Sequence, residues 1–202
     1  YAANLVDAWI PKLEGVRQKL EAGAKVADVG CGHGSSTIIM AQAFPRSTFH
    51  GFDFHEPSVE HARTRARDAG VASNTIFEVV AAKEYPGGDY DLVTIFDALH
   101  DMGDPVGASG HILGSLSDGG TFMLVEPLAG DSVEENQHPL GQIYYSLSTM
   151  ICTPASKAQE VGLALGAQAG EKRLTEVLKQ AGFTRVRRAA ETPTNMVLEA
   201  QA

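Results

Sequence analysis

Residues 26–36 read VADVGCGHGSS, with three glycines at alternate positions directly after an apolar run. The apolar run is typical of a buried strand, and the residues after the glycines are typical of a helix. In a turn of this kind, Gly30 allows a sharp exit from the strand and Gly32 allows a ligand to touch the main chain. Gly34 lets the helix pack closely and direct its N-terminal N–H groups at the ligand. A plain tight turn without a ligand is the alternative.

Strand-like and helix-like stretches alternate along the rest of the chain. This alternation predicts βαβ units, and hence an α/β fold with a doubly wound, seven-stranded, mostly parallel sheet. The last two strands are joined by a short connection that contains Pro193, so we expect the last strand to be antiparallel. The expected strands are 24–30, 47–53, 74–82, 90–97, 121–127, 182–191 and 194–202, and the expected helices include 35–44, 56–70 and one within 104–120 that is ended by glycines.

The length of 202 residues and the hydrophobic content of 44% indicate one domain, residues 1–202, with one well-buried core. Residues 1–20 read as a helix without an initiator Met, so we expect an N-terminal part to be missing. Residues 127–173 are too long for a simple connection and predict an insertion on the side of a substrate, where lids and pockets are commonly built.

Charge, cysteine content and hydropathy exclude several classes of function. The net charge of −9 argues against nucleic-acid binding by this domain, because that binding depends on Lys and Arg. No apolar run approaches the roughly 20 residues that span a bilayer. The cysteines, Cys31 and Cys152, form no CxxC pair, which favours free thiols in a reducing compartment. We therefore expect a cytoplasmic protein without a membrane partner.

Two aspartates extend the case for a ligand at the glycine turn. Asp28 lies in an otherwise apolar strand, so burying it requires hydrogen bonds from the turn or the ligand. Asp53 ends the second strand, where a carboxylate can accept both hydroxyls of a ribose; a helix cap is the alternative. The spacing G-x-G-x-G differs from the dinucleotide pattern G-x-G-x-x-G/A, whose third small position falls on Ser35. This favours a nucleoside with a small zwitterionic tail over a dinucleotide.

With these motifs the chain resembles the class I S-adenosylmethionine-dependent methyltransferases from about residue 20 to 202. The antiparallel seventh strand is typical of that family. The resemblance implies S-adenosylmethionine as the cofactor, with Asp53 at the ribose and Phe54 beside the adenine. Its further implied cofactor contacts are Asp28, Gly30, Gly32 and Gly34 at the methionine end and Ala82 and Lys83 at the adenine end. Many family members carry an Asp where this chain has Ala82 and Lys83.

The stretch FDALHDMGDP, residues 96–105, resembles the LHDW region of small-molecule O-methyltransferases typified by the plant phenolic enzymes. The resemblance implies that Asp97 faces the methionine part of the cofactor and that His100 is the general base. An imidazole with a pKa near ~6.5 is available to take a proton from a phenol whose pKa is near ~10. Glu126 and Glu171 correspond loosely to the acidic partners of that base.

Two other interpretations of this stretch stay open. His100 and the neighbouring Asp101 could be a helix cap and a surface pair. Alternatively, four side chains with the spacing i, i+3, i+4 and i+7 could bind a divalent metal ion if they lay on one face of a helix. These are Asp97, His100, Asp101 and Asp104. Because Asp97 belongs to a strand end, we expect no metal site.

Three stretches together resemble those of bacterial methyltransferases that carry an N-terminal winged-helix domain, namely residues 96–105, 125–131 and 144–171. That domain is absent here, and in such enzymes it supplies dimer contacts and part of the acceptor pocket. The resemblance therefore implies a small-molecule methyl acceptor and a homodimer formed through the missing part. A regulatory domain that binds the cofactor without turnover is the alternative, and a nicotinamide-dependent oxidoreductase is disfavoured by Ser35.

Overall fold

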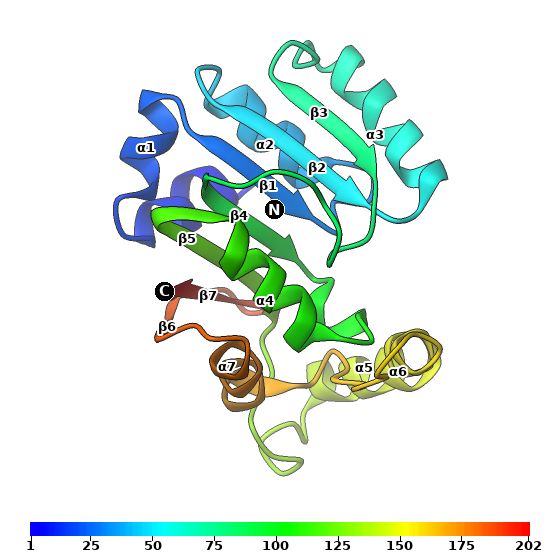
Figure 1. The fold of residues 1–202 in the computed structure, drawn as a ribbon. Coiled ribbons are helices and arrows are strands. Elements are labelled where there is room, and N and C mark those ends of the chain that lie inside the picture. Colours follow the sequence, from blue (N-terminus) through cyan, green and yellow to red (C-terminus); the bar gives the residue numbers. More distant parts are fainter.

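The computed structural model describes residues 1–202, which form one seven-stranded sheet with helices packed on it (Figure 1). The strand order is β3-β2-β1-β4-β5-β7-β6. Strands β1 to β5 pair in parallel, while β7 is antiparallel to both β5 and β6, which confirms the predicted sheet. The strands are β1 (Lys25–Val29), β2 (Thr48–Asp53), β3 (Thr75–Val79), β4 (Tyr90–Phe96), β5 (Leu116–Pro127), β6 (Arg185–Glu191) and β7 (Asn195–Gln201).

Helices cover both faces of the sheet. In Figure 1, α4 (Pro105–Ser115) and α7 (Gly170–Gln180) lie in front of it, and α2 (Ser35–Ala43) lies behind. Helices α1 (Val16–Ala22) and α3 (Glu56–Asp68) pack on the same face as α2. The insertion contributes α5 (Pro139–Leu147), η4 (Ser148–Cys152) and α6 (Thr153–Lys157), and a short turn η3 (Leu99–Asp101) follows β4.

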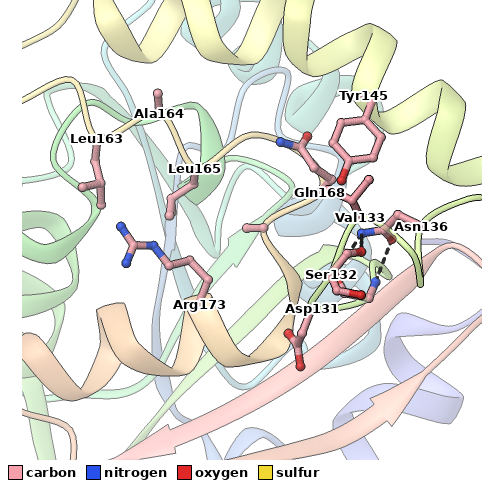
Figure 2. Close-up of a pocket in the computed structure, with 12 residues that line it drawn as sticks. Asp131, Ser132, Val133, Asn136, Tyr145, Leu163, Ala164, Leu165, Gln168 and Arg173 are labelled. Carbon is pink, nitrogen blue, oxygen red and sulfur yellow. Dashed lines mark hydrogen bonds between the residues drawn. The ribbon is translucent and has the colours of Figure 1, made fainter.

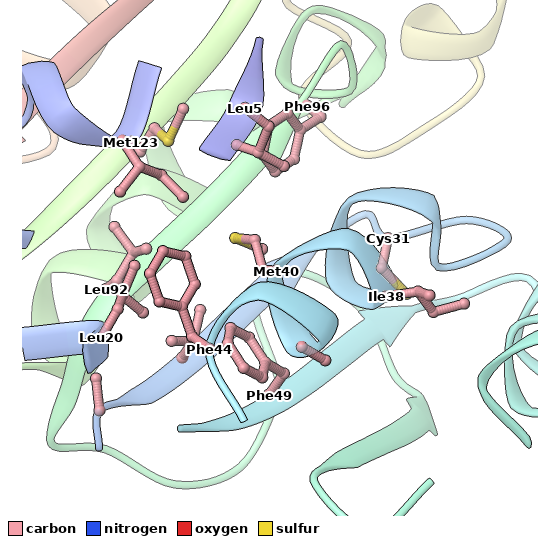
Figure 3. Packing of buried hydrophobic residues seen from close by; sticks show 14 of the residues in the cluster. Leu5, Leu20, Cys31, Ile38, Met40, Phe44, Phe49, Leu92, Phe96 and Met123 are labelled. Atoms are coloured by element: carbon pink, nitrogen blue, oxygen red, sulfur yellow. The ribbon is translucent and has the colours of Figure 1, made fainter. Parts of the chain in front are cut away.

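The core consists of two layers because successive side chains of a strand point to opposite faces of the sheet. Val26 and Leu92 pack against α1 and α2, whereas their neighbours Ala27 and Val93 pack under α4 and α7. The layer beneath α2 is shown in Figure 3, where Met40 of α2 lies among side chains from the strands and from α1. Both layers are buried, as expected for a parallel sheet with helices on each side.

The prediction of one helix over residues 1–20 is wrong. The segment contains η1 (Leu5–Trp9), η2 (Ile10–Lys12) and then α1. Leu13 is extended, and Gly15 has φ of +70°, so the backbone turns between the short pieces. A left-handed residue cannot continue a right-handed helix, so α1 begins anew after Gly15.

The glycines near residue 120 do not end the preceding helix, contrary to the prediction. Helix α4 ends at Ser115, and β5 begins at the next residue. The pairing of β5 with β4 is irregular between Tyr90 and Leu92. A Cβ at Gly120 would lie 2.8 Å from the carbonyl oxygen of Tyr90, so Gly120 permits this irregular pairing.

No helix in residues 1–202 has both the length and the apolar character needed to cross a membrane.

Candidate cofactor and catalytic site

The strand order reverses direction between β1 and β4, and ligands of open α/β sheets bind at this point, outside the carboxyl ends of the strands. A cleft of about 570 Å³ lies there. Its walls come from Gly30 after β1, Asp53 and Phe54 after β2, and Ala98 after β4. Residues 80–83 also line the cleft. They follow β3, which stops at Val79 rather than at Ala82 as the sequence predicted.

The glycine loop has left-handed backbone conformations at Gly30, Gly32 and Gly34, with φ of +71°, +50° and +71°. A Cβ at Gly34 would lie 2.9 Å from the ring of Phe77 and 3.0 Å from Ala62 of α3, so close packing of the following helix requires glycine. A Cβ at Gly32 would meet nothing within 4 Å. The main chain at Gly32 therefore borders open space, which suits a ligand that contacts the backbone.

Asp28 lies in β1, directly before the glycine loop, and stabilises it. Its buried carboxylate accepts hydrogen bonds from Ser36 (2.7 Å), Thr37 (2.6 Å) and Thr94 (2.9 Å). Burial raises the pKa of Asp28, and the three hydroxyl groups act in the opposite direction. Both carboxylate oxygens have partners within the chain, so Asp28 fastens the loop to α2 and β4 rather than lining the cleft.

Asp53 holds the other side of the loop. One carboxylate oxygen accepts the N–H of Gly32 at 2.9 Å, and the other accepts the N–H of His55 at 2.9 Å. A carboxylate oxygen can accept more than one hydrogen bond, so both oxygens retain capacity for a second donor such as a ribose hydroxyl. Phe54 is 75% exposed beside it and offers a flat apolar face at the cleft.

Asp97 follows β4 in a left-handed conformation with φ of +48°, which turns its side chain out of the strand direction. Its carboxylate accepts hydrogen bonds from the hydroxyl of Tyr1 at 2.5 Å and from the amide of Asn195 at 3.0 Å. Burial raises the pKa of Asp97, which both hydrogen bonds oppose. A cofactor contact with Asp97 therefore requires the Tyr1 hydroxyl to move or to share the carboxylate.

His100 and Glu126 form a buried pair next to the cleft. The His100 side chain is 6% exposed and the Glu126 side chain 2%, and the imidazole Nδ1 contacts one oxygen of Glu126. The other oxygen of Glu126 accepts the N–H of Leu99 at 3.0 Å, which fixes the carboxylate. The two residues that follow His100, Asp101 and Met102, line the cleft itself.

The charges around His100 control its protonation. Burial lowers the pKa of the imidazole, but Glu126, Asp101 and Asp97 act more strongly together and raise it to about 9. Burial raises the pKa of Glu126 in turn, and His100 opposes that shift. The carboxylates around His100 therefore favour the protonated form of its imidazole.

Lys83 and Glu171 take part in surface ion pairs. The Lys83 ammonium lies 2.9 Å from Asp104 and 3.1 Å from Glu160, so it links the cleft wall to α4 and the insertion. Glu171 binds the guanidinium of Arg188 and does not contact His100. Of the two acidic residues expected beside His100, only Glu126 contacts it.

The insertion contributes to the cleft and contains a second cavity of its own. Ala155 and Gln159 line the cleft opposite Ala82. The second cavity, of about 270 Å³, lies among Asp131, Tyr145, Gln168 and Arg173 and shares no lining residue with the cleft (Figure 2). Four apolar side chains of α5 and η4 are exposed to solvent: Ile143, Leu147, Met150 and Ile151.

A family model described as a methyltransferase domain matches residues 20–182. The chain belongs to this methyltransferase family. The match begins within α1 and includes the glycine loop, the second-strand carboxylate and the His100 segment. The resemblance to class I S-adenosylmethionine-dependent methyltransferases is thereby confirmed.

Named relatives of this methyltransferase domain match parts of it. It is 38% identical over 87 residues to a 27-O-demethylrifamycin SV methyltransferase of Amycolatopsis mediterranei (strain S699), covering 42% of this chain and 32% of that protein. It is 36% identical over 100 residues to a ubiquinone biosynthesis O-methyltransferase of Bordetella avium (strain 197N), covering 48% and 38%. The matched segments thus span about a third of these relatives' length.

Solved structures share the fold of this methyltransferase domain over most of its length. Human N-acetylserotonin methyltransferase in complex with S-adenosylmethionine has a TM-score of 0.70 at 18% identity, covering 97% of this chain and 51% of that chain. Mitomycin 7-O-methyltransferase has a TM-score of 0.70 at 19% identity, covering 93% and 55%. The domain corresponds to about half of each of these solved chains.

Replacing Asp53 with Ala tests the ribose side of the site. We expect the dissociation constant for S-adenosylhomocysteine to rise by the equivalent of ~1.5–3 kcal/mol, because charged hydrogen bonds to the ligand and to the Gly32 loop are lost. Isothermal titration calorimetry measures this change. Asp68→Ala, at the exposed end of α3, is the matched control and should leave the affinity unchanged. An unchanged affinity in Asp53→Ala would remove Asp53 from the site.

Proposed function

We propose that this methyltransferase domain transfers a methyl group to a hydroxyl group of a small molecule, with His100 as the general base. The observation that carries the proposal is the buried His100–Glu126 pair at the carboxyl ends of the strands, next to a cleft that Gly30, Asp53 and Asp101 help to line. The relatives support oxygen as the acceptor atom, since those described above are named as O-methyltransferases or as a methyltransferase whose name carries the 27-O position.

The residues present fit S-adenosylmethionine. Asp53 retains acceptor capacity for the ribose hydroxyls, Phe54 offers a face for the adenine, and Ala82 and Lys83 stand on the adenine side of the cleft. The loop of Gly30, Gly32 and Gly34 would hold the methionine end, and Asp28 would keep that loop in place. A role for Asp97 would require it to give up or share its hydrogen bond with Tyr1. When bound, S-adenosylmethionine supplies an electrophilic methyl group on a sulfonium centre.

His100 would remove the proton of the acceptor hydroxyl at Nε2. Glu126 holds Nδ1, so the two ring nitrogens have different roles and the ring cannot rotate freely. Nε2 faces Asp101, at 3.4 Å, and Cys152. The Asp101 side chain is 39% exposed, so its movement toward solvent would open a route for the acceptor from the cleft to Nε2. The insertion, through Ala155 and Gln159, would form the acceptor side of that route.

Ligand-induced stabilisation tests the cofactor assignment. S-adenosylhomocysteine at 100 times its dissociation constant should stabilise the fold by roughly 2.7 kcal/mol, which raises the melting temperature of a domain of this size by roughly 5–10 °C. Differential scanning fluorimetry measures the shift. NAD is the matched control ligand and should give no shift, because Ser35 stands at the third small position of the dinucleotide pattern. Stabilisation by NAD alone would contradict the assignment.

A cofactor-binding regulatory domain without turnover is the second candidate. The burial of His100 favours it, because an acceptor cannot reach the ring while Asp101 and Cys152 cover Nε2. Binding of S-adenosylhomocysteine together with a failure of phenols and other hydroxylated metabolites to accept a methyl group would favour this candidate. Transfer to any such acceptor that depends on His100 would exclude it.

A further inference from the structure

Three different metal-ligating side chains converge on the outer side of His100. One ring nitrogen of His100, a carboxylate oxygen of Asp101 and the sulfur of Cys152 all lie within 4.8 Å of one another. The ring nitrogen next to Asp101 is Nε2, at 3.4 Å. His100 and Cys152 are buried, and Asp101 is half-buried. They come from η3 and η4, two segments about 50 residues apart in the sequence that the insertion brings together.

The hydrogen bonding of His100 leaves Nε2 directed at this group. Nδ1 is engaged by Glu126, which is itself fixed by the Leu99 N–H. In zinc sites, a ligating imidazole commonly donates its second ring N–H to a carboxylate, which sets the tautomer and strengthens the ligand. The His100–Glu126 pair already has this arrangement.

Asp101 adds an unsatisfied acceptor. Its oxygen Oδ1 is buried and has no hydrogen-bond partner, although it lies 3.4 Å from His100 Nε2. Oδ1 faces the protonated imidazole at this distance, and a cation that replaced the proton on Nε2 would bind both atoms directly. Two nitrogen or oxygen ligands at ~2.0–2.1 Å from zinc stand about 3.4 Å apart in a tetrahedral site, which matches the observed separation.

We propose that His100, Asp101 and Cys152 form a binding site for a thiophilic divalent cation of the zinc class, with a fourth position open to water. Imidazole, carboxylate and thiolate are all zinc ligands, and three protein ligands with one open position are a common zinc arrangement. The thiolate is the form of cysteine that binds a metal ion, so binding at Cys152 replaces the proton of its thiol by the cation.

These three ligands differ from the set with helical spacing in the sequence, which contained Asp97 and Asp104 in place of Cys152. Asp97 bonds Tyr1 and Asn195, and Asp104 caps α4 through the N–H of Gly107 and pairs with Lys83. These two carboxylates therefore have other partners. Cys152 takes their place, and no spacing in the sequence connects it with His100.

Cobalt absorption spectroscopy tests the site without relying on catalysis. Chelator-treated protein titrated with Co²⁺ should take up one equivalent and develop the visible bands of tetrahedral cobalt and a thiolate-to-cobalt charge-transfer band. Zn²⁺ should displace the cobalt. Cys152→Ser should abolish the charge-transfer band and weaken Zn²⁺ binding by more than ~100-fold, and Glu126→Gln should weaken it by ~10–100-fold.

Cys31→Ser is the matched control, because Cys31 is the other free buried thiol and should leave the cobalt spectrum unchanged. If Cys152→Ser does not fold, the site is tested with Asp101→Asn, because the Asp101 side chain is partly exposed. This variant should bind Zn²⁺ at least ~10-fold more weakly. Uptake of no tetrahedral cobalt, or a charge-transfer band that survives Cys152→Ser and disappears in Cys31→Ser, would overturn the proposal.

One consequence rests on the proposed function. A cation on Nε2 occupies the lone pair that a general base needs, so Zn²⁺ should inhibit methyl transfer in step with its occupancy. The cobalt titration reports binding in either case. Binding without inhibition would count against His100 as the base, while a missing cobalt spectrum would count only against the metal site.

Discussion

His100→Ala should lower kcat for methyl transfer by ~10²–10⁴-fold, the range expected for loss of a positioned general base. The remaining rate reflects the positioning of acceptor and cofactor, which the imidazole does not provide. The change in the dissociation constant of S-adenosylhomocysteine should be small, because His100 does not line the cleft. Steady-state kinetics and calorimetry on the same preparation separate the two effects.

His111→Ala is the matched control for that replacement. His111 lies on α4, where its ring contacts the carbonyl oxygen of Tyr85, and it has no part in the site. Its replacement should leave kcat within about twofold of the unaltered protein, since it perturbs packing away from the reacting groups. If His100→Ala and His111→Ala have equal kcat, His100 is not the base.

The rate of methyl transfer should rise with pH up to about 9. A general base acts in its neutral form, and Glu126, Asp101 and Asp97 overcome the effect of burial and raise the pKa of His100 to about 9. Below that pKa the neutral fraction falls about tenfold per pH unit, so kcat/KM at pH 7 should be about 100-fold below its plateau. The profile is measured with a chelator present, so that no cation binds Nε2.

Glu126→Gln provides the matched variant for the pH profile. The amide oxygen can still accept a hydrogen bond from Nδ1, but the charge that raises the pKa of His100 is gone. The midpoint of the profile should therefore move to lower pH. A flat profile between about pH 6 and 9, or an unmoved midpoint in Glu126→Gln, would contradict His100 as the titrating base.

Much of the fold could be predicted because its signals are local. The strands β1, β2 and β4 are apolar runs of five to seven residues, and their ends agree with the prediction within one or two residues. The antiparallel β6–β7 pair follows from a short connection that leaves no room for a crossover helix. The N-terminal segment could not be predicted in the same way, because its amphipathic pattern persists through residues whose backbone leaves the helical region at Leu13 and Gly15.

The candidate site, too, could be predicted from the sequence only in part. Asp53 and the glycines could be located because a strand end and a loop spacing determine their positions. The partners of Asp97 could not, since Tyr1 and Asn195 are about 100 residues away from it and carry no motif. Glu126 was one of two acidic candidates, and the choice depends on β5 lying beside β4, which places Glu126 next to the His100 turn.

The position of β7 inside the sheet affects how the chain acquires its structure during synthesis. Residues 195–201 hydrogen-bond to β5 on one side and to β6 on the other, and most of their side chains are buried. Until this segment has left the ribosome, β5 presents an open apolar edge and β6 has no neighbour. The nascent chain therefore exposes an unpaired sheet edge, the kind of surface that supports edge-to-edge aggregation, until residues 195–201 have emerged and paired.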